Sequence, residues 1–279
     1  MIPCLSEATT MPAEFDADLR ACAQAACPAL EVWLTKLENF LQRNSLDATR
    51  RLIEEHGVRL AAAAVQGGIL LTQGEARRES FALLERRLEL CHSLEIETLV
   101  VAADFADEVS STDYERAVVS LKQAALLAAP RGVRLALEFH GRARFCNNLS
   151  TAAALVEHAG EPNAGICFDV FHYYTGPSKF EDLALLSRDN LFHVQLSDLA
   201  GIPRELATDS DRVLPGDGDF ALPPILDYLR SIGYAGFVSV ELMNPNLWRL
   251  DPVQVSEVAI TALRKLLGQT GNGAGDGFD

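Results

Sequence analysis

Positive charge is scarce in this sequence. Lysine and arginine together number 24, against 39 aspartate and glutamate residues, which gives a formal net charge of −15 at pH 7. A field of that sign repels nucleic-acid phosphates and anionic membrane surfaces. We therefore expect neither a nucleic acid nor a membrane as a partner, and we expect the acidic side chains to favour cations.

Paired cysteines, long apolar runs and a leader segment are also missing. The six cysteines form no C-x-x-C motif, and several lie inside apolar runs, as Cys167 does in AGICF, which is typical of buried thiols in a reducing compartment. No stretch approaches the roughly 18 apolar residues of a membrane span. The first residues, MIPCLSEATT, lack the basic and apolar regions of a signal peptide. We expect a cytoplasmic protein.

The sequence does contain a regular alternation of short apolar runs and longer helical patterns. No G-x-G-x-x-G motif follows any of the runs, which counts against a dinucleotide-binding fold. Eight strand–helix units within 279 residues indicate an α/β protein with the (β/α)₈ architecture of a TIM barrel. The expected strands span residues 2–9, 30–34, 59–65, 96–103, 134–140, 165–172, 191–197 and 237–242.

Capping residues delimit several of the expected helices. One helix begins near Ser45 and stops at Gly57, and the last has Asp251 as its cap, Pro252 as its first residue and Gly268 at its end. No linker interrupts the pattern, so we expect a single domain over 1–268, followed by a disordered tail over 269–279. The remaining helical patterns span about 76–93, 112–129, 149–159, 180–188 and 222–232.

Each of the last four apolar strands carries a polar residue at its carboxyl end. The interior of a parallel barrel is packed with aliphatic side chains, and its chemistry lies at the carboxyl ends of the strands. Neighbouring strands lie about 4.8 Å apart, so four side chains at such ends can meet at one point. The residues are Glu138, Asp169, Gln195 and Glu241.

These four residue types suit one divalent metal ion. Three carboxylates that face one another in a partly dry pocket repel, and a cation removes that cost. Oxygen ligands fit Mn²⁺ or Mg²⁺, and less selectively Co²⁺ or Zn²⁺. A single carboxylate of this kind is best explained as a strand end that reaches solvent, but four at matching depth favour a metal site.

Two further residues are candidates for substrate binding. His172 follows Asp169 closely, and a hydrogen bond within the loop explains it equally well. Arg212 lies in a long loop at about 199–221, where an ion pair with Asp211 or Asp217 is the competing explanation. His140 and His193 are weaker candidates, which packing within a strand also explains, and we favour packing for His193. Glu31 either faces the pocket or braces Lys36, and we favour a structural role for it.

Several phrases resemble a known family. LALEFHGR, FDVFHYYTG, HVQLSD, DRVLPGDGD and VSVELMNP are similar to the xylose-isomerase-like barrel superfamily of sugar-phosphate isomerases and epimerases, over nearly the whole chain. Within it the phrases resemble those of the inosose isomerases, which interconvert keto-inositols. The resemblance implies a metal bound by Glu138, Asp169, the residue at 195 and Glu241, with His172 and Arg212 touching substrate.

The third ligand departs from the inosose-isomerase pattern. That pattern has histidine where this chain has Gln195, whereas branches similar to hydroxypyruvate isomerases have glutamine there. A neutral amide oxygen still completes a site for a hard cation, but it binds Zn²⁺ less tightly than imidazole does.

These residues predict an isomerase or epimerase of a small polyhydroxylated ketone, either a keto-inositol or a ketose. Glu138 and Glu241 would transfer the proton, and the metal would stabilise an enediolate. One alternative is a dehydratase of a cyclic keto acid such as 3-dehydroshikimate, with Arg142, Arg144 or Arg212 holding the carboxylate. A non-catalytic sugar-binding barrel is another, and the charge argues against a metal-dependent endonuclease. A homo-oligomer is compatible with exposed apolar residues such as Phe171 and Trp248.

Overall fold

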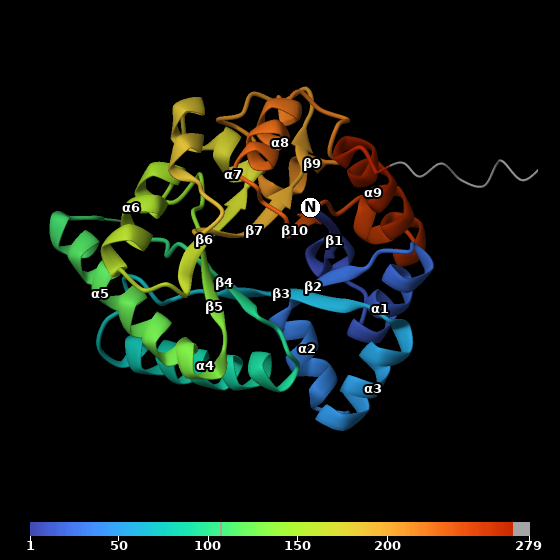
Figure 1. Cartoon of the computed structure of the whole chain (residues 1–279), viewed down its shortest axis with the longest axis horizontal. Coiled ribbons are helices and arrows are strands. Elements are labelled where there is room, and N and C mark those ends of the chain that lie inside the picture. Colours follow the sequence, from blue (N-terminus) through green and yellow to red (C-terminus); the bar gives the residue numbers. More distant parts are fainter. Residues whose placement is uncertain (107, 270–279) are drawn as a thin grey trace, which may run out of the picture.

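A closed barrel of eight parallel strands forms the centre of the molecule (Figure 1). The computed structural model describes residues 1–106 and 108–269. Around the barrel the order is β1-β10-β7-β6-β5-β4-β3-β2, and β1 closes it against β10. The expected (β/α)₈ barrel is confirmed. Its strands are β1 (Ile2–Ser6), β2 (Ala29–Trp33), β3 (Arg59–Gln66), β4 (Thr98–Ala102), β5 (Arg134–Glu138), β6 (Ala164–Asp169), β7 (Leu191–Leu196) and β10 (Phe237–Val240).

Helices surround the barrel, and α9 packs against both α1 and β1 (Figure 1). Two short strands, β8 (Asp198–Leu199) and β9 (Arg212–Val213), form a separate antiparallel pair beyond β7. None of the described helices combines the length and the apolar character that a bilayer crossing requires. The α-helices are α1 (Phe15–Gln24), α2 (Leu34–Leu41), α3 (Leu46–His56), α4 (Gly74–Ser93), α5 (Ser111–Ala128), α6 (Leu149–Ala159), α7 (Val170–Thr175), α8 (Leu222–Ser231) and α9 (Pro252–Leu267).

Two strands are shorter than expected, and helical turns follow where the strands were expected to continue. The first strand ends at Ser6, and a 3₁₀ helix spans Glu7–Thr10, where the Ser6 hydroxyl accepts a hydrogen bond from the Ala8 amide. The sixth strand ends at Asp169, whose carboxylate accepts from the Phe171 amide and so begins α7. The helix expected at 180–188 is a 3₁₀ helix over Phe180–Leu185. The sequence patterns did not identify α1 or α2, and the expected tail falls, from residue 270 on, outside the described residues.

The predicted caps are confirmed. Ser45 caps α3 by accepting from the Ala48 amide, and Gly57 ends it with φ of 62°, a left-handed conformation that glycine adopts without a Cβ penalty. Asp251 caps α9 through the Val253 amide, Pro252 is the first helical residue, and Gly268 ends the helix. Local capping chemistry therefore sets the limits of these two helices.

Small and polar side chains fill the interior of the barrel, whereas we expected aliphatic ones. Because side chains alternate along a strand, Leu135 and Leu137 face the helices and belong to the main core, whereas Ala136 belongs to a separate cluster of mainly small residues. Fully buried polar side chains, those of Glu31, His193 and Ser239, share this interior. Small and polar residues here leave room for the polar groups at the strand ends.

We predict that Asp251→Ala lowers the free energy of unfolding by about 1 kcal/mol, because the first turn of α9 loses its side-chain acceptor. Thermal or urea denaturation measures this change. Gln254→Ala, an exposed substitution on the same helix, serves as the control and should leave stability within about 0.5 kcal/mol. Equal stability of the two variants would contradict a structural role for the cap.

Candidate active site

The four predicted strand-end residues lie at the same end of the barrel. Glu138 and Asp169 are the last residues of β5 and β6, Gln195 lies one residue before the end of β7, and Glu241 follows β10 directly. Asp169 is level with Gln195, and Gln195 is level with Ser239 on β10. All four side chains are buried, so the closed barrel brings them to one place.

Two of these residues form a group with His172. Single ligand atoms of Glu138, Asp169 and His172 all lie within 4.8 Å of one another. Nε2 of His172 is 3.7 Å from Oε1 of Glu138 and 3.5 Å from Oδ2 of Asp169. The imidazole reaches this position because α7 begins at the Asp169 cap, which turns the chain back over the strand end.

The other two residues bind each other. Nε2 of Gln195 donates to Oε1 of Glu241 at 3.1 Å. The hydroxyl of Ser6, at the end of β1, donates to the same oxygen at 3.4 Å. The carboxylate of Glu241 is therefore held from the two strands that flank β10.

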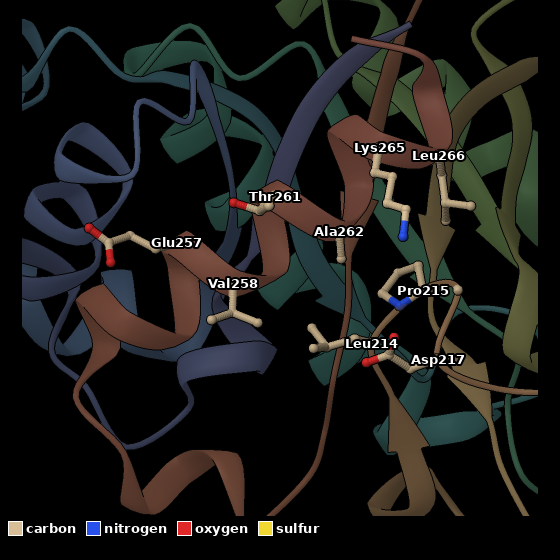
Figure 2. A pocket seen from close by; sticks show the side chains of 10 residues that line it. Leu214, Pro215, Asp217, Glu257, Val258, Thr261, Ala262, Lys265 and Leu266 are labelled. Atoms are coloured by element: carbon tan, nitrogen blue, oxygen red, sulfur yellow. The ribbon is translucent and has the colours of Figure 1, made fainter. Parts of the chain in front are cut away.

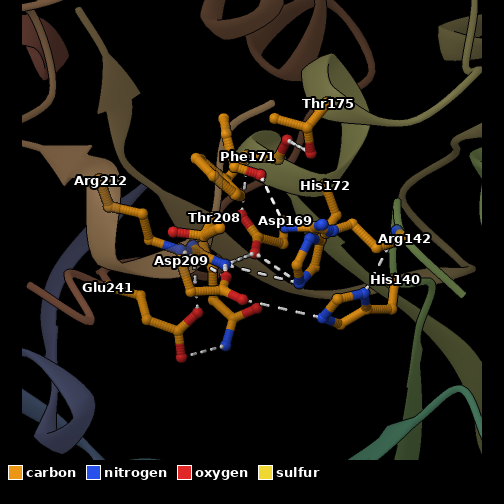
Figure 3. A network of polar contacts seen from close by, with 12 residues as sticks. His140, Arg142, Asp169, Phe171, His172, Thr175, Thr208, Asp209, Arg212 and Glu241 are labelled. Atoms are coloured by element: carbon orange, nitrogen blue, oxygen red, sulfur yellow. Dashed lines mark hydrogen bonds and ion pairs between the residues drawn. The ribbon is translucent and has the colours of Figure 1, made fainter. Parts of the chain in front are cut away.

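Arg212 connects the two groups (Figure 3). Its Nη2 donates to Oδ2 of Asp169 and to Oδ1 of Asp209, both at 2.7 Å, and its Nη1 lies 3.3 Å from Oε2 of Glu241. The guanidinium carbon lies 4.3 Å from the centre of the Phe171 ring. This fully buried arginine thus occupies the space among the strand-end carboxylates.

Two alternatives considered from the sequence are wrong: an ion pair of Arg212 with Asp211 or Asp217, and an exposed position for Phe171. The carboxylate of Asp211 accepts from the amide and hydroxyl of Thr208, and that of Asp217 is in an exposed residue, so neither is the ion-pair partner of Arg212. Phe171 is 1% exposed and packs with Leu199 and Ala207, so it is not a surface residue available for subunit contact.

Burial changes the protonation of the site. It raises the pKa of the Glu138 carboxyl well above its ordinary value, and the charge of Asp169 adds to this. Burial also raises the pKa of Glu241 well above its ordinary value, although Arg212 opposes the shift. Burial lowers the pKa of His172 to about 3, so the ring is neutral at pH 7. Burial alone would lower the pKa of Arg212, but the carboxylates around it raise it, so the arginine stays charged.

Sequence reasoning missed Asp209 and undervalued His140. Asp209 precedes Arg212 by three residues, across a 3₁₀ turn, and binds its guanidinium. Oδ2 of Asp209 lies 3.9 Å from Nε2 of His140, whose ring is 4.0 Å from that of His172. The acidic phrase Thr208-Asp-Ser-Asp-Arg212 was the available signal, but the sequence does not tell which of its carboxylates turns inward.

Glu31 and His193 face the barrel interior beneath the site. Oε1 of Glu31 accepts from Nε2 of Gln195 at 2.8 Å. Nε2 of His193 lies 3.2 Å from the other oxygen of Glu31. Glu31 does not brace Lys36, which instead pairs with Asp18 and Glu7. Glu31 and His193 thus form a polar layer under Gln195 and are not isolated packing residues.

A pocket on the outside of the barrel lies apart from the strand-end group (Figure 2). Its volume is about 390 Å³, and it lies between α9 and the loop that follows β9. None of the predicted site residues lines it, and its lining is mainly apolar, with Asp217, Glu257 and Lys265 as the charged residues.

The strand-end group fits a divalent cation. Four carboxylates, those of Glu138, Asp169, Asp209 and Glu241, face the single positive charge of Arg212. Desolvated carboxylates in such excess are costly without a further positive charge. Carboxylate and amide oxygens are suitable ligands for Mn²⁺, Mg²⁺ and related ions. The donor atoms are therefore of the kind that a divalent cation takes as ligands.

Comparison with known proteins finds relatives that match nearly the whole chain. The chain is 27% identical to the inosose isomerase of Halalkalibacterium halodurans over 92% of this chain and 93% of that protein. It is 28% identical to the inosose isomerase of Bacillus velezensis over the same shares. A 3-dehydroshikimate dehydratase of Pseudomonas aeruginosa is 29% identical, over 66% of this chain and 28% of the dehydratase.

The fold also matches solved structures. A crystal structure of the IolI protein with a bound zinc atom superposes with a TM-score of 0.92, at 25% identity, over 98% of this chain and 100% of that one. The D-psicose 3-epimerase structure determined with D-fructose shares the fold at a TM-score of 0.77. The model of the xylose isomerase-like TIM barrel family matches residues 19–266. The chain therefore belongs to the xylose isomerase-like TIM barrel family.

Proposed function

We propose that this protein is a divalent-metal-dependent isomerase or epimerase of a small, uncharged polyhydroxylated ketone, such as a keto-inositol or a ketose. The observation that carries the proposal is the convergence of Glu138, Asp169, Gln195 and Glu241 around Arg212 at the strand ends. The inosose isomerases among the relatives, which match nearly the whole chain, support an isomerase of a sugar-like substrate.

Glu138, Asp169, Gln195 and Glu241 would hold the metal. A divalent cation bound there would supply Lewis-acid stabilisation of the negative charge that develops on substrate oxygen. Zinc in the IolI structure supports a divalent ion of this class. Mn²⁺, Mg²⁺, Co²⁺ and Zn²⁺ are all compatible with the ligands.

Proton transfer is assigned to the two glutamates. Glu138 and Glu241 come from β5 and β10, which are three strands apart in the closed barrel, so they approach the site from different sides. One takes the proton from the carbon beside the carbonyl and the other moves the hydroxyl proton or returns a proton to carbon. Without a cation, burial raises the pKa of both carboxyls above the ordinary value.

His172 and Arg212 are assigned to the substrate oxygens. The His172 ring is neutral, so it offers a hydrogen bond without adding charge, and its Nδ1 has no hydrogen-bond partner among the described residues. Nη1 of Arg212 likewise makes no hydrogen bond in the described part of the chain. A substrate oxygen at either atom would break no hydrogen bond there, and at Nη1 of Arg212 it would share the positive charge with Oε2 of Glu241, 3.3 Å away.

The charge of the site favours a neutral substrate over a keto acid. The positive charge of Arg212 is already opposed by Asp169, Asp209 and Glu241. Arg142, a candidate for a substrate carboxylate, is exposed and donates to the Ala207 carbonyl at 3.2 Å. The dehydratase relatives keep 3-dehydroshikimate as the second candidate substrate, and its carboxylate would enter a site with excess negative charge.

Metal content is the first test. After incubation with Mn²⁺ and removal of the excess, elemental analysis should find about one equivalent in the native protein. Glu241→Gln should retain little, with an affinity lowered by more than about 100-fold, since even changes outside the ligand sphere cost about 10–100-fold. Glu257→Gln, an exposed change of the same kind on α9, should retain the metal. Equal retention in all three proteins would exclude the proposed site.

Turnover is the second test, with keto-inositols and ketoses as substrates and NMR to follow both product and exchange of the carbon-bound proton in D₂O. Glu241→Gln should lower kcat by about 10²–10⁴-fold, the typical contribution of a positioned acid–base group. A conjugated, ultraviolet-absorbing product from 3-dehydroshikimate would instead favour the dehydratase. Substrate binding without proton exchange would favour the non-catalytic sugar-binding barrel.

Substitution of Arg212 separates its two roles. Arg212→Ala should raise KM about tenfold or more, because it removes a donor to substrate. It should also lower stability by about 3–5 kcal/mol, because it leaves buried carboxylates without their counter-charge. Kinetics and urea denaturation measure the two effects, with Arg230→Ala on the exposed face of α8 as control. An unchanged KM would restrict Arg212 to a structural role.

A further inference from the structure

The amide of Gln195 has a defined orientation, and its neighbours determine it. Its Nε2 donates to Oε1 of Glu31 at 2.8 Å and to Oε1 of Glu241 at 3.1 Å, whereas its Oε1 accepts from the thiol of Cys167 at 3.2 Å. An ionised carboxylate accepts hydrogen bonds and cannot donate them, and a thiol is a weak donor. The orientation with nitrogen toward the two glutamates satisfies all three contacts, because Oε1 of Glu31 and Oε1 of Glu241 accept and the Cys167 thiol donates.

Glu31 is the more firmly placed of the two glutamates. It is fully buried on β2, and Nε2 of His193 lies 3.2 Å from its Oε2. Its Oε1 accepts from Nε2 of Gln195 at 2.8 Å, so two side chains of β7, those of Gln195 and His193, approach the two oxygens of this carboxylate. Glu31 is thus the acceptor that faces the Gln195 amide from the interior of the barrel.

A glutamine needs such an acceptor more than a histidine does. The two ends of a primary amide have nearly the same shape, so the amide can turn over and exchange its oxygen for nitrogen. With nitrogen bound to Glu31, the amide oxygen of Gln195 is bound only by the weak Cys167 donor. The oxygen then stays available as a ligand atom, and the second N–H of the amide holds Glu241.

We propose that Glu31, supported by His193, is a positioning residue that fixes the Gln195 amide with its nitrogen toward Glu31 and Glu241, and so sets both Gln195 and Glu241 for cation binding. This inference rests on the proposed metal site, but its central contact lies within the protein itself. Glu31 acts through Gln195, and the side chains that contact its carboxylate, Gln195 and His193, both come from β7.

The test without metal follows the side-chain NH₂ signals of Gln195 by ¹⁵N NMR of glutamine-labelled apoprotein, assigned by their loss in Gln195→Ala. In the native protein these signals should be well resolved and slow to exchange with solvent. Glu31→Gln and Glu31→Asp should shift them and speed their exchange, because the carboxylate acceptor is replaced by an amide that can present either end, or is shortened. Circular dichroism would detect a folding defect in either variant, and the other variant would then still test the proposal. Unchanged signals in folded variants would overturn the proposal.

The test with metal is a double-mutant cycle on Mn²⁺ affinity, measured by calorimetry. Glu31→Gln should weaken binding about 10-fold or more, and the same change in a Gln195→Ala background should add almost nothing, because Glu31 acts through Gln195. Glu38→Gln, which alters an ion pair with Arg87 outside the barrel, controls for net charge. Additive losses would overturn the proposal. Absence of Mn²⁺ binding in the native protein would refute the proposed metal site, and the NMR test would then decide the role of Glu31 by itself.

Discussion

The excess of buried negative charge at one end of the barrel is the constraint on which the rest of the site depends. Glu138, Asp169 and Glu241 are withdrawn from water with one guanidinium between them, and each ionised carboxylate in that environment carries a large desolvation cost. The hydrogen bonds from Ser6, Gln195 and the α7 amide reduce this cost. This excess of buried negative charge favours a divalent cation and a neutral substrate as ligands.

The strand ends were predictable from the sequence because they depend on local patterns. Period-two alternation places Glu138 on the same face as Ala136, and an apolar run that stops at a carboxylate marks the mouth of a parallel barrel. The caps of α3 and α9 follow from Ser45 and Asp251 for the same reason. The ends of strands one and six were misjudged because the Ser6 and Asp169 side chains begin helical turns inside apolar runs.

Contacts between distant segments were not predictable in this way. Arg212 and Asp169 are 43 residues apart, and Gln195 and Glu31 are 164 residues apart. No periodicity encodes which of Asp209, Asp211 and Asp217 turns toward Arg212, since that choice depends on a 3₁₀ turn and on the Thr208 hydrogen bonds. The contact between Glu31 and His193 was not predictable for a related reason, because inward-facing residues on different strands meet only when the barrel closes.

The pairing of β1 with β10 has a consequence for the order in which the molecule is built. Ser6 lies near the start of the chain and Glu241 near its end, yet they share a hydrogen bond across this closing seam. During synthesis from the amino end, most helices and strands can pack before the partner of β1 has left the ribosome. The charged cluster is then the last part to assemble, so a chain stalled before β10 exposes both the edge of β1 and unshielded carboxylates.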